Sequence, residues 1–417
     1  MKVPRRQFLK AIGAAATLGS GSKFSIKSAK GPMSGTKTYD VAVIGAGVFG
    51  SWTASCLCQS GASVALLDEY GSANARASSG GESRIIRMGY GPAEIYTRWS
   101  TQALPRWQKL FAETGQPQLF QPTGVLWMAY ANDQYALDTL ATFEKNGVKC
   151  SRFSFDELRS RYPQIVFDDG SWGIYEPDSG VLLARRAVQT VVAQAQKNGV
   201  DYLTGAALAP TGRGRVTELK TAGGGSISAG TFVFACGPWL GKVFPDVVGD
   251  RIFVTRQEVF FFGVPAGETR FSAPAMPTWI NLRDEHYGMP DIESRGFKIA
   301  FDRHGPAADP DTQSRIATAK GAAAAGKYLA RRFPALSNAP VVESRVCQYE
   351  NTSNGDFLID KHPAFENVWL VGGGSGHGFK HGPSLGEYVA ERVLRGGAVD
   401  PRFSLGTKAS IQKRAVF

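Results

Sequence analysis

The sequence predicts an α/β fold organised around a strand, a turn, a helix and a second strand within residues 39–68, and three observations predict it. Residues 40–44 form a short apolar, β-branched run, which is typical of a buried parallel strand. The turn that follows has the pattern Gly-x-Gly-x-x-Gly, formed by Gly45, Gly47 and Gly50. After a run of small residues, a second apolar strand ends at Asp68.

Each part of this unit has a physical role in binding a dinucleotide. The first glycine permits the tight turn, the second lets a pyrophosphate approach the backbone, and the third lets the helix pack closely on the sheet. Backbone amides at the start of the helix then face the phosphates. The carboxylate of Asp68 can accept hydrogen bonds from both hydroxyls of an adenosine ribose. The combination predicts a Rossmann-type dinucleotide site at Gly45, Gly47, Gly50 and Asp68.

Composition limits the class of protein. The 417 residues suggest two domains or one large interleaved fold, and 43% hydrophobic with 20% charged residues is ordinary for a soluble globular protein. After the N-terminus, no stretch of 18 apolar residues predicts a membrane span. The net charge is +11, but residues 1–40 hold eight basic residues against Asp40 alone. Most of the excess belongs to this leader, so we expect no nucleic-acid partner.

The leader resembles an export signal. Arg5-Arg6-Gln7-Phe8-Leu9-Lys10 is similar to a twin-arginine motif, and a mildly apolar Ala/Gly run follows at residues 11–21. A transit peptide is the alternative, since the segment is also basic and rich in serine. The adjacent arginines favour recognition by the twin-arginine export machinery and a periplasmic or exported location. No cleavage site is distinct, so an uncleaved N-terminal anchor stays open.

The five cysteines show no spacing typical of a metal site, and we expect no metal. Cys236 follows an apolar run and is expected to be a small core residue.

Patterns along the chain predict further elements. Helices are expected at residues 94–114 (interrupted by Pro105), 133–146, 156–161, 184–198, 311–333 and 384–394. Asp311 is expected to cap the helix that it begins. Strands are expected at residues 124–130, 200–203, 231–235, 253–264, 296–301 and 368–371. Residues 278–294 are expected to be a loop that lines a pocket.

The C-terminal half then carries a specific resemblance. Residues 346–349, 357–360, 374–380 and 386–387 are similar to the signature of the monomeric sarcosine oxidase family. That group includes N-methyltryptophan oxidase and pipecolate oxidase, within the D-amino-acid oxidase-like FAD enzymes. Ser83-Arg84-Ile85-Ile86-Arg87 and Phe297-Lys298 also match, so the resemblance covers residues 39–394.

The resemblance implies how FAD is held. The cysteine aligned with Cys347 bonds covalently to the 8α-methyl of FAD, whereas an inert strand cysteine is the alternative. Arg84 resembles a residue near the flavin ring. The remaining implied cofactor-binding residues are Ser83, Gly374, Gly376, His377, Gly378 and Lys380.

The resemblance also assigns catalytic roles. Arg87 and Lys380 match a clamp on the substrate carboxylate, and Lys298 matches the lysine that activates dioxygen. Solvated surface charges and an edge-strand lysine are the alternatives. Asp302 stands where the family commonly has histidine, and His304 does not restore the pattern by a simple slip. Asp302 therefore leaves the substrate-facing side of the pocket open.

Together these expectations describe a discontinuous Rossmann-type FAD-binding domain with an interleaved mixed-sheet substrate domain. After the leader and linker (1–36), the FAD-binding domain takes residues 37–121, 180–250 and 345–417, the last with a C-terminal tail. The substrate domain takes residues 122–179 and 251–344.

The implied activity is oxidation of a secondary amino acid to an imine by hydride transfer to flavin N5. Dioxygen is then reduced to hydrogen peroxide by an enzyme expected to be monomeric. A dehydrogenase that passes electrons to a quinone or periplasmic carrier is one alternative. A non-catalytic flavin-binding or amine-sensing protein is the other.

Overall fold

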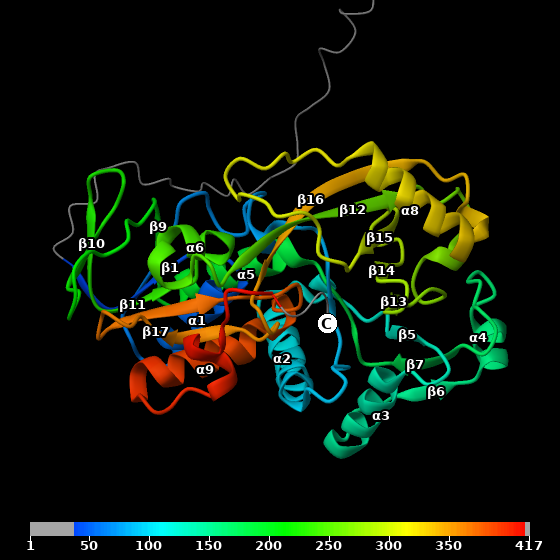
Figure 1. Ribbon diagram of the computed structural model, residues 1–417, viewed down its shortest axis with the longest axis horizontal. Helices are drawn as coiled ribbons and strands as arrows, with labels where there is room; N and C mark the ends of the chain where they lie inside the picture. The colour runs from blue at the N-terminus through cyan, green and yellow to red at the C-terminus, as the bar shows by residue number, and fades with distance from the viewer. Residues whose placement is uncertain (1–36, 413–417) are drawn as a thin grey trace, which may run out of the picture. The chain divides into compact units, whose positions relative to one another are not determined.

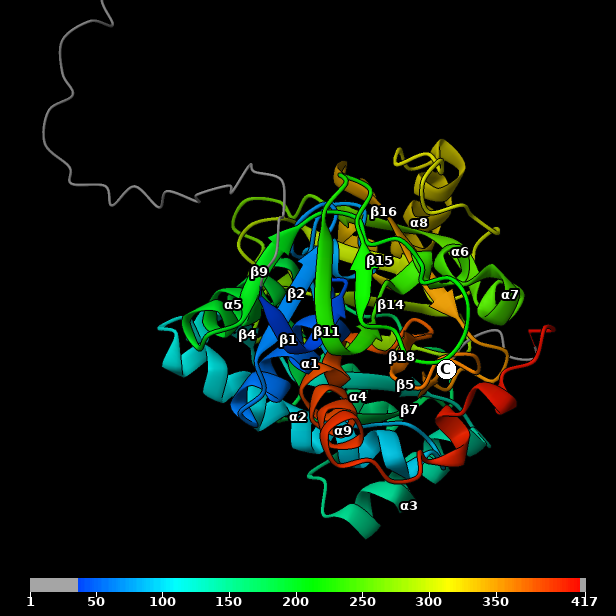
Figure 2. The same cartoon turned by 90° about the vertical axis from the view of Figure 1, so that its left-hand side faces the viewer.

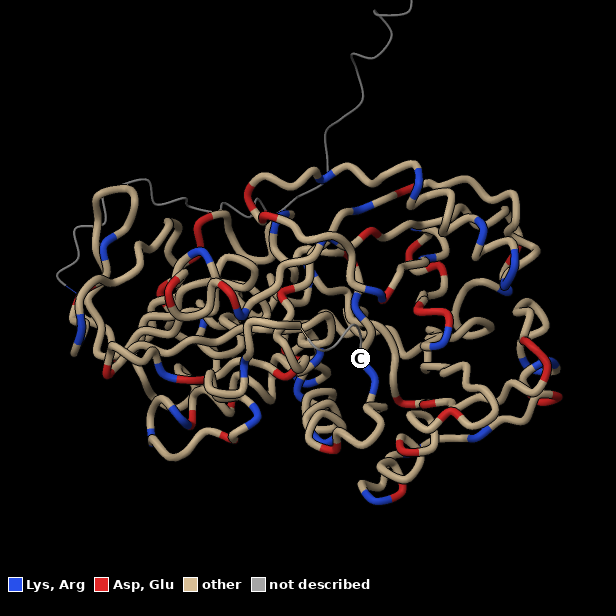
Figure 3. Tube along the Cα trace, viewed as in Figure 1, with Lys and Arg blue, Asp and Glu red and all other residues tan. Residues whose placement is uncertain are grey.

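The computed structural model describes residues 37–412, which lie in one compact unit of the chain (Figure 1). Arg5 and Arg6 fall outside these residues. No helix of residues 37–412 is long and apolar enough to cross a membrane, and no cluster of metal-ligating side chains occurs among them. Basic and acidic residues are interspersed along the described trace (Figure 3).

The first large sheet contains the predicted nucleotide-binding unit. Its strand order is β17-β18-β11-β1-β2-β9, with β10 added beside β11. Pairs among β18, β11, β1, β2 and β9 are parallel, while β17 and β10 pair antiparallel. The bounds are β1 Thr38–Ile44, β2 Val64–Asp68, β9 Asp201–Thr204, β10 Glu218–Lys220, β11 Ser226–Phe234, β17 Leu358–Lys361 and β18 Val368–Gly372.

Helices α1 (Val48–Gln59), α5 (Ala184–Lys197) and α9 (Gly382–Arg395) pack beside this sheet (Figure 2). Helix α1 is buried along most of its length because it lies between the sheet and α9. Gly386 of α9 permits this approach, since a Cβ there would overlap the backbone of Trp52. The turn between β1 and α1 is therefore held rigidly from both sides.

The second large sheet is mixed, with strand order β16-β12-β15-β14-β13-β5-β7-β6. Its pairs are antiparallel except for β13 with β5. Helix α8 (Ala319–Arg332) packs on it through Ala325, Tyr328 and Leu329. The bounds are β5 Val125–Ala129, β6 Ser151–Phe153, β7 Trp172–Glu176, β12 Phe253–Phe262, β13 Thr278–Asn281, β14 His286–Met289, β15 Phe297–Phe301 and β16 Val341–Asn351.

A third, small sheet joins three short strands that are far apart in the sequence. It contains β3 (Arg84–Ile86), β8 (Gly180–Leu182) and β4 (Phe120–Gln121). The other long helices are α2 (Glu94–Glu113), α3 (Gln134–Asn146) and α4 (Phe155–Arg161). The expected α/β class with a mixed second sheet is confirmed.

Three expectations about elements are wrong. Residues 311–318 are not helical, because the Asp311 carboxylate accepts a hydrogen bond from Trp239 Nε1 at 2.7 Å and pairs with Lys242. Helix α8 begins only at Ala319, where Thr318 Oγ1 caps it by accepting from the Gly321 amide at 3.0 Å. Asp311 is therefore not its cap.

Pro105 does not interrupt α2, which continues to Glu113. Pro105 is exposed, so the backbone carbonyl that lacks its amide partner lies on the solvent-facing side of the helix and can be hydrated. The expected loop at residues 278–294 contains strands β13 and β14, which pair antiparallel. Its sequence carries too few apolar alternations to predict them.

Candidate active site

The predicted glycine turn has the conformation that a dinucleotide requires. Gly45 has φ +104°, and a Cβ there would overlap the Ala235 carbonyl oxygen. Gly50 packs against Gly45, so a side chain at Gly50 would overlap the carbonyl of that first glycine. The Asp68 carboxylate closes the turn by accepting the backbone amides of Ala46 at 2.7 Å and Tyr70 at 2.9 Å.

Burial raises the pKa of Asp68, and these amide hydrogen bonds oppose that rise. With the Gly71 amide as a third donor, the carboxylate still keeps room to accept a hydrogen bond from a ribose hydroxyl.

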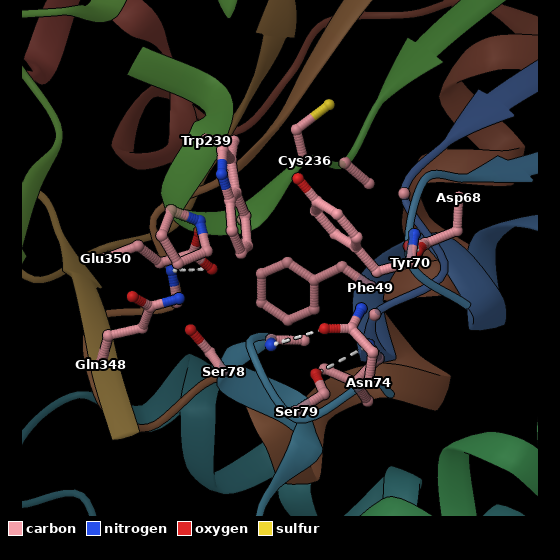
Figure 4. A pocket seen from close by; sticks show the side chains of 18 of the residues that line it. Phe49, Asp68, Tyr70, Asn74, Ser78, Ser79, Cys236, Trp239, Gln348 and Glu350 are labelled. Atoms are coloured by element: carbon pink, nitrogen blue, oxygen red, sulfur yellow. Dashed lines mark hydrogen bonds between the residues drawn. The ribbon is translucent and has the colours of Figure 1, made fainter. Parts of the chain in front are cut away.

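A long cavity of about 1250 Å³ of empty volume extends from this turn. Figure 4 shows Asp68 and Glu350 on opposite sides of it, with the Phe49 ring between them. Few polar side chains line it, and its glycines leave the backbone accessible to a ligand, which suits an extended dinucleotide. Predicted residues that line it are Gly45, Gly47, Asp68, Arg84, Cys347, Gly374, Gly376 and Gly378. The cavity therefore fits FAD, with Asp68 at the nucleotide end and Cys347 at the flavin end.

Cys347 lies on β16, and its sulfur faces a guanidinium. Arg84 Nη2 donates to Cys347 Sγ at 3.2 Å and to the Ser78 carbonyl at 2.6 Å. Arg84 Nη1 donates to the Ser83 carbonyl at 2.8 Å, so three contacts fix the guanidinium. Arg84 and Cys347 thus lie together at one corner of the cavity.

Glu350 is a cavity residue that the sequence reasoning missed. It is 8% exposed, and Gly374 N donates to its Oε1 at 3.3 Å. Its Oε2 has no hydrogen-bond partner among residues 37–412. Burial raises the pKa of Glu350 to about 7. The available signal was an acidic residue three positions after Cys347, within an otherwise uncharged motif.

Lys298 lies on β15 in a second cavity. It is 2% exposed, and its Nζ donates to Ser83 O and Ser83 Oγ at 3.1 Å each. Burial, and after it the charge of Arg84, lowers the pKa of Lys298 to about 7. This cavity has about 770 Å³ of empty volume, and Ser83 lines it while the adjacent Arg84 lines the first. Residues 83 and 84 therefore separate the two cavities.

Arg87 and Lys380 meet at one aromatic ring. The Arg87 guanidinium lies 4.3 Å from the centre of the Tyr90 ring, and Lys380 Nζ lies 5.3 Å from it. Both side chains are buried. Lys380 Nζ also donates to Tyr90 OH and to the His377 carbonyl, each at 2.8 Å. Burial and the charge of Arg87 together hold the pKa of Lys380 well below its ordinary value.

Glu176, at the end of β7, fixes the segment that carries Arg87. It accepts the Met88 amide at 2.7 Å, the Gly89 amide at 3.1 Å and Trp127 Nε1 at 2.6 Å. Trp127 in turn lies 4.8 Å beneath the Arg87 guanidinium. This support was not predicted, since its parts are far apart in sequence.

His377 and His381 complete this network. Tyr90 OH contacts His381 Nε2 at 2.8 Å and His377 Nδ1 at 3.3 Å. Burial, and after it the charge of Lys380, lowers the pKa of His381 well below its ordinary value, so its ring is neutral near pH 7. His377, predicted to bind the cofactor, lies beside Tyr90 and does not line the first cavity.

Asp302 faces the same site. Its charge contributes to the raised pKa of Arg87 and partly opposes the lowering of the pKa of Lys380 by burial and by Arg87. It also adds to the rise that burial causes in the pKa of Tyr287 and Tyr349. The side chains of Tyr287 on β14 and Tyr349 on β16 are hydrogen-bonded to each other. Both tyrosines were missed, because neither stands in a pattern that is informative without the fold.

Comparisons with known proteins agree with this geometry. The family model described as FAD dependent oxidoreductase (DAO) matches residues 40–392. Monomeric sarcosine oxidase of Bacillus sp. (strain NS-129) is 30% identical over 369 residues, which cover 86% of this chain and 93% of that protein. N-methyl-L-tryptophan oxidase of Salmonella arizonae is 27% identical, covering 85% and 95%.

The fold has a solved counterpart. The structure of fructosyl peptide oxidase from E. terrenum superposes with a TM-score of 0.76 at 20% identity, covering 91% of this chain and 95% of that one. The family match spans both Asp68 and Cys347, at the two ends of a cavity shaped for FAD. On sequence and on site geometry alike, the chain belongs to the DAO family of FAD dependent oxidoreductases.

Proposed function

We propose that this oxidoreductase oxidises a secondary amino acid to an imine and reduces dioxygen to hydrogen peroxide. The observation that carries the proposal is the pair of buried cations, Arg87 and Lys380, on either side of Tyr90. Burial and the charge of Arg87 hold the pKa of Lys380 well below its ordinary value, so an anion bound beside both groups would stabilise the charged form of Lys380 beyond what Asp302 contributes. The carboxylate of an amino acid supplies that anion.

The residues around this pair have complementary tasks. A bidentate contact from Arg87 and a charge from Lys380 hold the carboxylate and orient the carbon next to nitrogen toward the first cavity. The residues of the first cavity would hold FAD, which would supply hydride acceptance from that carbon and two-electron reduction of dioxygen. Lys298, in the second cavity, supplies a positive charge where reduced oxygen species develop. Water then hydrolyses the imine after release.

Asp302 sets the substrate preference within this proposal. A carboxylate that acts on both Arg87 and Lys380 adds negative charge beside the substrate site. It favours amines with an additional cationic or hydroxyl-rich group, and it disfavours plain sarcosine. Relatives named for sarcosine and for N-methyltryptophan support the secondary-amine class.

Two finer features belong to the same proposal. FAD is attached covalently through Cys347, which lines the cavity beside Arg84. The enzyme is exported by the twin-arginine route, which the Arg5-Arg6 pair supports.

An anaerobic screen tests the proposal. Sarcosine, larger N-methyl amino acids and cyclic amino acids are each added without oxygen, and bleaching of the flavin absorbance is followed. We expect a larger secondary amino acid to bleach the flavin faster than sarcosine, and Asp302→His to shift the preference toward sarcosine. If no secondary amino acid bleaches the flavin, the proposal fails. If sarcosine is best and Asp302→His changes nothing, the specificity argument alone fails.

Variants of the cation pair test the binding mode. Losing one partner of a buried charged contact costs about 2–5 kcal/mol, so Arg87→Ala and Lys380→Ala should each raise the substrate Kd by about 30-fold or more. The matched control is Lys109→Ala, which removes an exposed cation of α2 and should leave the substrate Kd unchanged.

A further inference from the structure

Glu350 is a buried carboxyl group aimed into the FAD cavity with half of its hydrogen-bonding capacity unused. The Gly374 amide contacts Oε1, and Oε2 has no partner among residues 37–412. Glycines surround the group: a Cβ at Gly237 would lie 3.3 Å from Oε2, and one at Gly374 would lie 3.1 Å from Oε1. Within residues 37–412 no side chain satisfies Oε2, so the cavity offers a place for a bound group to do so.

The position of Glu350 identifies that group. It follows Cys347 by three residues on β16, and Cys347 marks the flavin end. The charges of Asp68 and Glu350 both raise the pKa of Cys236, so Cys236 lies within reach of both carboxyls. Glu350 therefore lies between the two ends of the cavity, where the central section of FAD would be held.

The electrostatics there favour a neutral carboxyl group once FAD is bound. The influences on its ionisation are burial and the Gly374 amide, and no basic side chain contributes. The titratable group facing it is the Cys236 thiol, whose burial raises its own pKa. The pyrophosphate adds two negative charges, which disfavour an ionised carboxylate further. A carboxylic acid, by contrast, can donate its proton to a phosphate or ribityl oxygen.

We propose that Glu350 binds FAD as a neutral carboxylic acid that donates Oε2–H to an oxygen of the cofactor's central section, so that FAD capture takes up one proton. The role concerns assembly of the holoenzyme, and it holds whichever amine the enzyme oxidises.

Reversible FAD binding provides the test. Cys347→Ser is the parent, so that no covalent bond forms, and the Kd for free FAD is measured by flavin fluorescence from pH 6 to 9. If one proton is taken up, the Kd should rise by up to about tenfold per pH unit above 7. Glu350→Gln keeps a donor but does not titrate, so its Kd should match the parent at pH 6 and stay level up to pH 9.

Lys298→Met in the same parent is the control, because burial also brings the pKa of Lys298 to about 7. The rise in Kd should persist in Lys298→Met. If it persists in Glu350→Gln, or disappears in Lys298→Met alone, the proposal is overturned.

A second measurement needs no change at Glu350. Calorimetric titration of FAD into the Cys347→Ser, Lys298→Met protein at pH 8, in two buffers of different ionisation enthalpy, counts protons directly. We expect an uptake near one proton per FAD. An uptake of zero overturns the proposal, while the amine screen would remain a separate test of the reaction.

Discussion

At the scale of single residues, burial sets the pH range in which Lys298 carries its positive charge. Two oxygens of Ser83 accept hydrogen bonds from the Lys298 ammonium group, but the burial of Lys298 still lowers its pKa to about 7. The charge is thus present below about pH 7 and is lost as the pH rises through that value. Its electrostatic contribution should follow the same pH dependence.

Lys298→Met tests this contribution. If the lysine stabilises negative charge on oxygen, the variant should slow reoxidation of the reduced flavin by on the order of 10²-fold, with little effect on anaerobic reduction. In the wild type the reoxidation rate constant should fall as the pH rises above about 7, and in Lys298→Met it should be level. Stopped-flow spectrophotometry measures both half-reactions.

The matched control is Lys220→Met, an exposed lysine of β10. Equal loss in both half-reactions would make Lys298 structural. Slow reoxidation in the wild type itself would favour a dehydrogenase.

The sequence predicted those site residues that stand in short motifs. Arg84, Arg87, Lys298 and Lys380 were predicted because the short motifs that contain them resemble those of the monomeric sarcosine oxidase family, and the fold places them around the two cavities and Tyr90. Glu176 was not found, because its function depends on amides brought to it from 87 and 88 residues away. Long-range hydrogen bonds of this kind leave no local pattern.

At the scale of elements, β16 carries much of the site. It pairs with β12 along nearly its whole length, and it presents Cys347, Gln348, Tyr349 and Glu350 to the cavity. The strand was only partly anticipated from the motif around Cys347. The start of α8 was misplaced because an acidic residue resembles a helix cap when its partners Trp239 and Lys242 cannot be seen.

The proposed covalent bond between FAD and Cys347 of β16 can be tested directly. Acid-precipitated protein should stay yellow, and mass spectrometry should find one FAD on the peptide that contains Cys347. Cys347→Ser should release the flavin into the supernatant, whereas Cys150→Ser, outside the cavity, should retain it. Release of all flavin from the wild type would refute attachment.

At the scale of the whole molecule, the chain passes repeatedly between its two large sheets. The FAD cavity draws on four stretches that are far apart in sequence, residues 44–84, 205–207, 235–243 and 347–379. The cavity exists only when most of the chain has folded. If the protein is exported as proposed, loading of FAD beforehand requires a route that carries folded protein, as the twin-arginine route does.

Changing Arg5 and Arg6 to lysine tests that route. The charge is retained but the guanidinium pair is lost, so we expect the flavin-loaded protein to stay in the cytoplasm. Cell fractionation followed by flavin fluorescence measures this. Lys23→Arg and Lys27→Arg, later in the leader, should not alter the distribution, and an unchanged periplasmic yield of the arginine variant would contradict the prediction.

The hydrogen bonds of Glu176 have a consequence for how such an enzyme diversifies. They tie the Arg87 segment to β7, whereas Tyr287 belongs to β14 and Asp302 follows β15. In the proposed function, the residues that hold the substrate carboxylate and those that face the amine therefore depend on different strands of the same sheet, with β13 and β5 between β14 and β7. Substitutions on β14 or after β15 can then change amine specificity while the Glu176 support of the Arg87 segment on β7 is kept.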